Sequence, residues 1–339
     1  MHALGKGKAM KVSLIATVLN AADHVPAFIE SVRAQTRPPD EIVVVDGGST
    51  DGTVEHLRAA TDIVTLVEPG ANIPRGRNVA IAHATHDVIA VADADCVYDP
   101  VWLERLLAPM QNGAAVAMGW YEPIMGSSWL DACTSSIGIG ASVEEIDEGT
   151  FLPSARSVAF RRDAIEMIGG FPEWLPIGED RWVGLRWRER GIEMRFVADA
   201  IARWRPRPTL AQTWNQYFRY ARGDAQAGMY PERHLIRFAT YAILVGVARS
   251  RRPLPLAVAL GAGAVHARRP LIRAREWAST TLDRGRVTIA LPALMAFVDL
   301  AKMAGYIAGL VDLARGTAGP RPVRPVAAGD APAAGSPSP

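Results

Sequence analysis

Short apolar segments alternate with segments of helical spacing through the first third of the chain. Four of the apolar segments have the length and β-branched content of buried strands, and they cover Val12–Leu19, Ile42–Val45, Ile63–Val67 and Val88–Ala92. Helices are predicted between them over Val25–Ala34, Val54–Ala60 and Pro74–Ala84. Strands that are apolar on both sides and alternate with helices are typical of a mostly parallel sheet flanked by helices. The sequence therefore predicts an α/β fold.

Further elements are predicted as far as Ala221. The pattern indicates strands over Ala114–Trp120, Ser157–Arg161 and Met194–Ala198, and helices over Pro100–Met110, Asp163–Ile168, Arg181–Arg190 and Leu210–Ala221. The segment Tyr121–Thr150 has no clear period, and no element is assigned to it.

The N-terminus superficially resembles a signal peptide. Lys6, Lys8 and Lys11 precede the apolar segment Val12–Leu19, but the segment is short and no small-residue cleavage site follows it. We therefore interpret Val12–Leu19 as the first strand of the sheet.

Acidic residues follow the predicted strands, where a parallel sheet binds its ligands. Asp93 and Asp95 come directly after Val88–Ala92, and alternate residues of an extended chain point to the same side. Two carboxylates placed in this way suit Mg²⁺ or Mn²⁺, which usually completes its coordination with substrate phosphates. The alternative interpretation is a solvated aspartate pair at the start of a turn.

Two more acidic clusters lie at the ends of predicted elements. Asp46 precedes a glycine-rich turn, and Glu179 and Asp180 precede a helix. On local pattern alone, the second pair also suits helix capping, because acidic residues stabilise helix N-termini. Three such clusters can form one acidic crevice, and a divalent cation would then allow a nucleotide diphosphate to bind there.

These segments together resemble family 2 glycosyltransferases, which have the nucleotide-diphospho-sugar transferase (GT-A) fold. The resemblance covers residues 11–222 and is carried by Val12–Asn20, Val43–Thr53, Arg77-Asn78, Asp93-Ala94-Asp95, Gly169-Gly170-Phe171 and Gly178-Glu179-Asp180. Many relatives read Asp-Asp-Gly-Ser where this chain reads Asp46-Gly47-Gly48-Ser49, so a base contact made by the second Asp is absent. The choice of nucleotide therefore stays open.

The resemblance implies which residues bind the donor. Thr17 and Asp46 match positions that contact the nucleoside, and Arg77 lies in the segment that passes near it. Asp93 matches an acid that contacts the ribose. These four residues are the expected donor-binding set.

The resemblance also implies the chemistry. Asp95 matches the acid that coordinates Mn²⁺ or Mg²⁺, and Asp180 matches the general base, with Glu179 beside it. The expected reaction moves a sugar from a nucleotide-diphosphate donor to an acceptor hydroxyl. It is a single displacement with inversion, in which a carboxylate removes the hydroxyl proton.

A motif near the end of the matched region concerns the acceptor. Gln216, Arg219 and Tyr220 look like a Gln-x-x-Arg-Trp motif with Tyr in place of Trp, and in polymerising relatives that motif lines the acceptor and diphosphate site. Arginine is well suited to phosphate. The alternative is an amphipathic helix whose aromatic residues pack inward, and the Tyr argues against a processive polymerase.

Charge is divided unevenly along the chain. Residues 1–180 hold 12 basic and 25 acidic residues, whereas residues 181–339 hold 25 basic and 10 acidic residues. Such asymmetry indicates different partners for the two halves. Because many arginines flank long apolar segments, an anionic membrane surface is expected rather than nucleic acid.

Three apolar segments follow residue 234, namely Leu235–Ala248, Leu254–Val265 and Val287–Leu313. The first two are shorter than the roughly 20 residues that span a bilayer, so interfacial or re-entrant helices are expected. The third is long enough, but it contains Asp299 and Lys302, which are spaced to pair on one helical face. Spanning, interfacial docking and a soluble helical subdomain all stay open for it.

We therefore expect three regions: a GT-A catalytic domain over residues 1–230, membrane-associated helices over 231–316, and a disordered Pro/Ala-rich tail over 317–339. The predicted protein is a membrane-associated glycosyltransferase with a cytoplasmic catalytic domain and a lipid-linked or membrane-proximal glycan acceptor. Cys96 and Cys133 form no CxxC motif, which argues against a disulfide scaffold or a zinc module.

Two alternatives remain. One is another nucleotide-using α/β enzyme such as a sugar nucleotidyltransferase, but Val18-Leu19-Asn20 stands where its glycine-rich signature is expected. The other is an inactive scaffold of the same fold that binds partners or membrane. Intact Asp95 and Asp180 argue against that scaffold.

Overall fold

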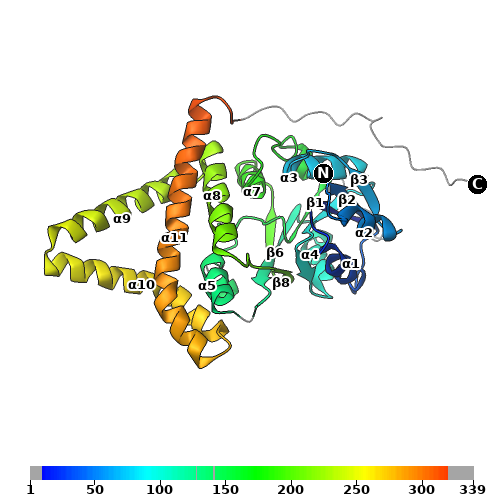
Figure 1. The fold of residues 1–339 in the computed structure, drawn as a ribbon. Helices are drawn as coiled ribbons and strands as arrows, with labels where there is room; N and C mark the ends of the chain where they lie inside the picture. Colours follow the sequence, from blue (N-terminus) through cyan, green and yellow to red (C-terminus); the bar gives the residue numbers. More distant parts are fainter. Residues whose placement is uncertain (1–9, 127, 140–141, 320–339) are drawn as a thin grey trace, which may run out of the picture. The chain divides into compact units, whose positions relative to one another are not determined.

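A computed structural model describes residues 10–126, 128–139 and 142–319 (Figure 1). The described residues form two compact units. Of the described residues, the first unit contains 10–122 and 146–204, and the second contains 123–126, 128–139, 142–145 and 205–319. Most of the tail predicted over residues 317–339 lies outside the described residues.

The first unit is built on an eight-stranded sheet with the order β3-β2-β1-β4-β7-β6-β8-β5. Strand β1 (Val12–Val18) pairs in parallel with β2 (Glu41–Asp46) and β4 (Val88–Asp93), and β2 pairs in parallel with β3 (Val64–Val67). The antiparallel pairs join β7 (Val158–Arg161) to β4, β6 (Val116–Pro123) to β7, and β5 (Cys96–Tyr98) to β8 (Met194–Trp204). The sheet is therefore mixed, with its parallel part formed by the first four strands.

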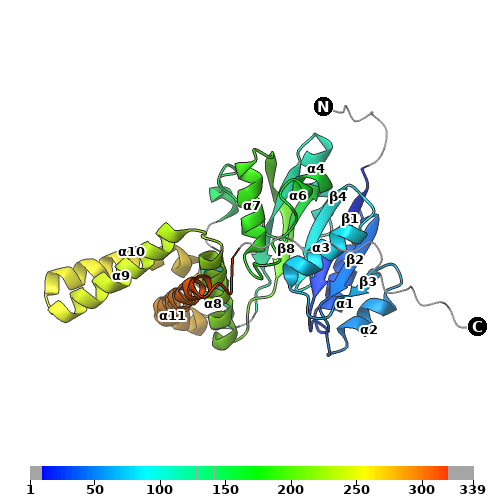
Figure 2. The same ribbon diagram turned by 90° about the horizontal axis from the view of Figure 1, so that it is seen from above.

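Helices cover both faces of this sheet, as predicted (Figure 2). Helices α1 (Val25–Arg33), α2 (Thr53–Ala59) and α4 (Trp102–Gln111) contribute to one hydrophobic layer, and α3 (Ile73–His83), α6 (Arg162–Glu166) and α7 (Glu179–Glu189) contribute to the other. Successive residues of a strand point to opposite faces, so Leu14 enters the first layer and Ile15 the second. The central strand β1 is thus buried from both sides.

The structure confirms the strands predicted in the first third of the chain and adds elements that were not predicted. Strand β5 has three residues, which is too short to give a pattern. The segment Tyr121–Thr150 contains α5 (Trp129–Gly138), where Ser128 caps the helix by accepting a hydrogen bond from the Asp131 N–H at 3.0 Å. Strand β8 is longer than Met194–Ala198 and runs to Trp204.

The second unit is helical. Helix α11 (Thr281–Ala314) packs against α8 (Leu210–Gln226), α5 and α10 (Pro253–Trp277), and α9 (Pro231–Ser250) completes the unit. The buried residues of α11 recur every three or four positions, so one side of this helix packs against the other helices. They include Val287, Leu291, Leu294, Val298 and Ala301. Helix α8 lies within the domain predicted over residues 1–230, but it packs against α11 in the second unit. The predicted domain boundary at residue 230 stays a prediction.

Helices α9 and α10 form a hairpin whose far end lies away from α11 (Figure 1). Its sides carry exposed apolar residues, because Leu254, Leu260 and Val265 are 74%, 67% and 75% exposed. The root of the hairpin is held by an ion pair, in which Arg237 Nε lies 2.7 Å from Asp299 Oδ1 of α11. Lys302 lies with its ammonium group 4.8 Å from the centre of the Tyr217 ring.

Candidate active site

Strand register places three of the predicted donor-binding residues at one edge of the sheet. Thr17 of β1 lies directly opposite Asp93 of β4, and the next residue, Val18, lies opposite Asp46 of β2. The carboxyl ends of parallel strands meet at the same edge, so residues far apart in sequence become neighbours there. Thr17 and Asp93 are partly exposed, whereas Asp46 is buried.

Helix α3 brings Arg77 against this edge. A Cβ atom on Gly76 would lie 2.7 Å from Thr17 Cγ2, so glycine is needed for α3 to approach β1 so closely. Arg77 follows and is buried, with 3% of its surface exposed. Its Nη2 lies 3.1 Å from Asp93 Oδ1, and its Nη1 donates a hydrogen bond to Glu179 Oε1. The guanidinium therefore bridges two of the predicted acidic clusters.

Burial dominates the electrostatics around Arg77. It raises the pKa of Glu179 to about 7, although Arg77 opposes the rise. Burial also raises the pKa of Asp93, again against Arg77 and with Asp95 adding to the effect. Burial works against the Arg77 cation too, but Glu179 and Asp93 hold the pKa of Arg77 above its ordinary value. One buried cation thus stabilises two carboxylates.

Glu179 and Asp180 are adjacent, but they lie in different environments at the start of α7. Gly178 caps this helix with a φ of 88°, in the left-handed region that favours glycine. Glu179 is 5% exposed and contacts Arg77, whereas Asp180 is partly exposed. The Asp180 carboxylate accepts hydrogen bonds from the Ala155 N–H at 3.2 Å and from the Arg181 N–H at 2.8 Å. Asp180 is therefore the member of the pair that a substrate can reach.

Asp46 uses its carboxylate within its own turn. The Oδ1 atom accepts hydrogen bonds from the backbone N–H groups of Gly48 at 2.8 Å and Ser49 at 2.7 Å. Asp46 therefore shapes the glycine-rich turn that follows β2. Its contact with the nucleoside stays a prediction.

Asp95 lies in the turn between β4 and β5 and is partly exposed. In the described part of the chain, no group of three or more His, Cys, Asp or Glu residues is arranged to hold a metal ion. Asp95 suits a cation that takes most of its ligands from substrate phosphates and water, as Mg²⁺ does, rather than a site enclosed by protein. The Asp95 carboxylate therefore fits the predicted Mn²⁺ or Mg²⁺ as a ligand.

Two residues close to Asp93 were not predicted from the sequence. The Tyr98 hydroxyl accepts a hydrogen bond from the Asp93 N–H at 2.9 Å and lies 3.1 Å from the Arg156 carbonyl oxygen, to which it donates. Cys96 is buried, and burial raises the pKa of its thiol well above the ordinary value. Its thiol therefore stays protonated and is a poor nucleophile.

Helix α8 carries the predicted acceptor or diphosphate residues in the second unit. Gln216 Nε2 donates a hydrogen bond to the Tyr220 hydroxyl at 3.0 Å, and Arg219 is exposed. Tyr217, between them, is buried against Val298 of α11. Part of the aromatic face of α8 thus packs inward, and the acceptor role of the motif stays a prediction.

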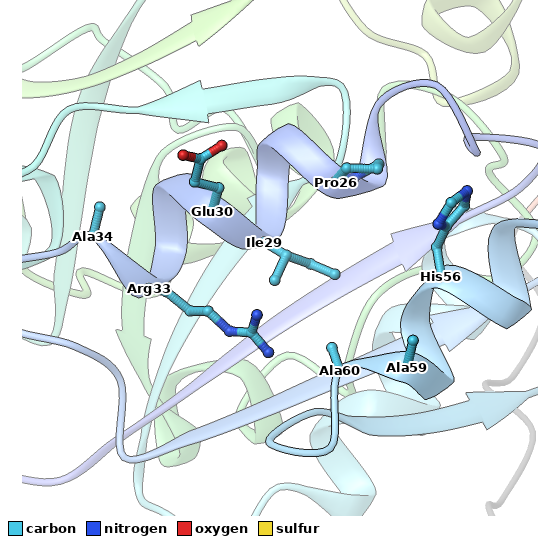
Figure 3. A pocket seen from close by; sticks show the side chains of 8 residues that line it. All are labelled: Pro26, Ile29, Glu30, Arg33, Ala34, His56, Ala59 and Ala60. Carbon is cyan, nitrogen blue, oxygen red and sulfur yellow. The ribbon is translucent and has the colours of Figure 1, made fainter.

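A surface hollow between α1 and α2 lies apart from these residues (Figure 3). It is lined by Pro26, Ile29, Glu30, Arg33, Ala34, His56, Ala59 and Ala60. None of the predicted site residues lines it, so we do not assign it to the active site.

Comparison with known proteins identifies the family of the N-terminal half of the chain. Residues 13–167 match the sequence model of glycosyl transferase family 2. The chain carries a family 2 glycosyltransferase domain. The matched region includes the strand ends with Thr17, Asp46, Asp93 and Asp95, and the chain is therefore a glycosyltransferase.

Relatives of this glycosyltransferase come from archaea and bacteria. It is 29% identical to Glycosyltransferase AglE of Haloferax volcanii over 255 residues, which is 69% of this chain and 80% of that protein. It is also 29% identical to the succinoglycan biosynthesis protein ExoA of Rhizobium meliloti over 73% of this chain and 74% of that protein. The O-antigen chain rhamnosyltransferase RfbN of Salmonella typhimurium is 25% identical, over 62% of this chain and 71% of that protein.

The glycosyltransferase also resembles a solved structure. The mannosyltransferase PcManGT from Pyrobaculum calidifontis, in complex with GDP-Man and Mn²⁺, matches with a TM-score of 0.58 at 19% identity, covering 86% of this chain and 87% of that one. This likeness confirms the predicted GT-A fold.

Proposed function

We propose that this glycosyltransferase moves a sugar from a nucleotide-diphosphate donor to a hydroxyl of a glycan or lipid-linked acceptor, with inversion at the anomeric carbon. The proposal rests on the presence, in the first unit, of both a partly exposed carboxylate, Asp180, and a strand-end cluster. The cluster is formed by Thr17, Asp93 and Asp95. Arg77 links the two parts through Glu179 and Asp93.

Asp180 has the geometry of a general base. Two backbone N–H groups, from Ala155 and Arg181, donate hydrogen bonds to its carboxylate and orient it. In a single displacement, the acceptor oxygen bonds to the anomeric carbon while the bond to the nucleoside diphosphate breaks, and Asp180 takes the hydroxyl proton. Cys96, which is buried and protonated, is no candidate for a covalent intermediate.

We propose that Asp95 holds the divalent cation and that Thr17, Asp46, Arg77 and Asp93 form the donor side, with Arg77 acting through the carboxylates that it positions. When bound, Mn²⁺ or Mg²⁺ would offset the negative charge that develops on the departing diphosphate. The solved mannosyltransferase of the same fold holds GDP-Man and Mn²⁺, which supports this choice of donor class and cation.

A thermal-shift screen tests the donor class. Ligand that binds the folded protein raises its melting temperature by mass action. Full-length protein with Mn²⁺ is heated in the presence of GDP-mannose, UDP-glucose or dTDP-rhamnose, with the matching nucleosides as controls. We expect one sugar nucleotide to raise Tm more than its nucleoside does. Equal shifts for nucleosides and sugar nucleotides would exclude recognition of the diphosphate.

We propose further that the second unit attaches the protein to a membrane and that the catalytic unit lies in the cytoplasm, where nucleotide sugars are found. Among the described residues, α11 is the one helix long and apolar enough to cross a bilayer, by length and composition. The hairpin adds exposed Leu and Val side chains, and Arg249, Arg251 and Arg252 lie at its far end. A surface of this composition suits an anionic lipid interface.

Replacing Leu254, Leu260 and Val265 together by Glu is expected to weaken vesicle binding by at least about 100-fold. Burial of each such side chain contributes about 1.5 kcal/mol or more, and a tenfold change in affinity corresponds to about 1.4 kcal/mol. Flotation of full-length protein with vesicles containing phosphatidylglycerol measures the effect. The matched control is Met167→Glu, at a residue of the first unit that is 53% exposed. Unchanged flotation of the triple variant would show that the hairpin does not bind the membrane.

A further inference from the structure

Arg156 lies on a short segment that connects the two halves of the proposed site. The preceding residue, Ala155, donates its backbone N–H to Asp180 Oδ2 at 3.2 Å. The Arg156 carbonyl oxygen accepts a hydrogen bond at 3.1 Å from Tyr98, whose hydroxyl also bonds the Asp93 N–H. The segment is therefore fixed at one end to the proposed base and at the other to the donor-side strand.

Two aromatic rings hold the side chain of Arg156. Its guanidinium carbon lies 5.5 Å from the centre of the Tyr121 ring and 5.4 Å from the centre of the Trp204 ring. Trp204 of β8 is the register partner of Cys96, the residue that follows Asp95. Cation–π contacts of this kind hold a guanidinium in place. The rings thus place a positive charge beside the turn that carries Asp95.

The two arginines of the site differ in their exposure. Arg77 is 3% exposed, and its charge is shared between Glu179 and Asp93. Arg156 is partly exposed and has Ser154 beside it, with Nη1 3.5 Å from the Ser154 Oγ. A ligand can therefore reach Arg156 but not Arg77.

We propose that Arg156 is an anion-binding residue of this site and that its guanidinium donates to phosphate oxygens of a substrate. The planar fork of arginine matches phosphate geometry, and hydrogen bonds between charged groups are about twice as strong as neutral ones. The phosphate belongs either to the donor diphosphate or to a phosphate-linked lipid acceptor. The assignment rests on the proposed function, because both ligands belong to sugar transfer.

Calorimetry on full-length protein with Mn²⁺ tests the assignment. The probes are GDP, UDP and dTDP for the donor, with guanosine, uridine and thymidine as nucleoside controls, and farnesyl phosphate with farnesol for the acceptor. We expect Arg156→Gln to weaken binding of a phosphate-bearing probe by about 10- to 100-fold and to leave nucleoside binding within about twofold. If the variant binds the nucleoside diphosphate more weakly, Arg156 binds the donor diphosphate. If it binds farnesyl phosphate more weakly, Arg156 binds the acceptor phosphate.

Two further variants complete the test, and two outcomes would count against the proposal. Arg105→Gln is the matched control, because Arg105 forms an exposed ion pair with Asp199. Arg156→Lys keeps a cation between the two rings, and we expect it to weaken binding of the phosphate-bearing probe by several-fold, because lysine lacks the planar fork of arginine. The Lys variant is used in place of Arg156→Gln if the Gln variant unfolds at a lower temperature than wild type. Affinities unchanged in the folded Arg156 variants would overturn the anion-binding role and leave Arg156 as a structural contact. If the wild-type protein binds no phosphate-bearing probe, the proposed function and the role of Arg156 both fail.

Discussion

Replacing Asp180 by Asn is expected to lower the turnover number for sugar transfer by about 10²- to 10⁴-fold, the usual contribution of a general base. The amide keeps the size of the side chain and can still accept one of the hydrogen bonds from Ala155 and Arg181. The affinity for the donor should therefore stay within a few-fold of wild type. Steady-state kinetics that separate kcat from KM check this expectation.

Glu179 is the competing candidate for the base, since its pKa of about 7 is well suited to proton transfer. Its position argues against that role, because the side chain is 5% exposed and bonded to Arg77. A group must first reach the proton that it removes, and the raised pKa of Glu179 follows mainly from burial. If Asp180→Asn kept more than about a tenth of wild-type turnover, the proton would have to go to another group.

Replacing Arg77 by Met is expected to lower the free energy of unfolding by about 3–5 kcal/mol at pH 8, the usual cost of leaving a buried charge without its partner. Methionine preserves most of the volume, so the loss reports the charge. Glu179 and Asp93 would remain close together without the cation that now lies between them. Urea unfolding measures the difference.

The loss should become smaller as the pH falls. Burial already raises the pKa of Glu179 in the folded protein above its ordinary value, and removing Arg77 raises it further. A carboxyl whose pKa is higher in the folded state binds protons more tightly there, so its contribution to stability improves below that pKa. Unfolding at pH 5 should therefore show a smaller difference between variant and wild type than unfolding at pH 8.

Arg105→Met is the control for this experiment. Arg105 and Asp199 form an ion pair in which the side chains are 54% and 56% exposed, and exposed pairs contribute at most about 1 kcal/mol. A loss for Arg77→Met no larger than that of the control would show that the buried pair does not stabilise the fold.

The parallel part of the sheet could be predicted from sequence because its strands are apolar on both sides. Such strands give continuous apolar segments between helices, and their ends fall at one edge by topology alone. The observed register brings Thr17, Asp46 and Asp93 to that edge, and their donor-binding roles stay a prediction. Asp95 and Asp180 were found as members of acidic clusters, and the resemblance supplied their roles.

The environment of each site residue could not be predicted in the same way. The motif that contains Arg77 does not show that Gly76 allows α3 to contact Thr17. It also does not show that the Arg77 guanidinium is buried. The pattern of Glu179 and Asp180 does not show which carboxylate faces inward. Arg156 belongs to no motif, because its position depends on Tyr121 and Trp204, which are distant in sequence.

The helical region shows a related limit. The apolar segments Leu235–Ala248 and Leu254–Val265 marked only the middle of α9 and part of α10, which extend over Pro231–Ser250 and Pro253–Trp277. Arginine is a good helix former, so α10 continues through the basic stretch that follows Val265. Hydropathy therefore located these helices but did not give their lengths.

The most direct test of the proposed function is the release of nucleoside diphosphate from a sugar nucleotide by full-length protein. Wild type and Asp95→Ala are incubated with GDP-mannose, UDP-glucose or dTDP-rhamnose, with Mn²⁺ or with EDTA, in the presence of membranes that supply acceptor. We predict release from one donor that depends on Mn²⁺ and is lost in Asp95→Ala. Release that is the same in Asp95→Ala and wild type, or in EDTA and Mn²⁺, would contradict a metal-assisted transfer at this site.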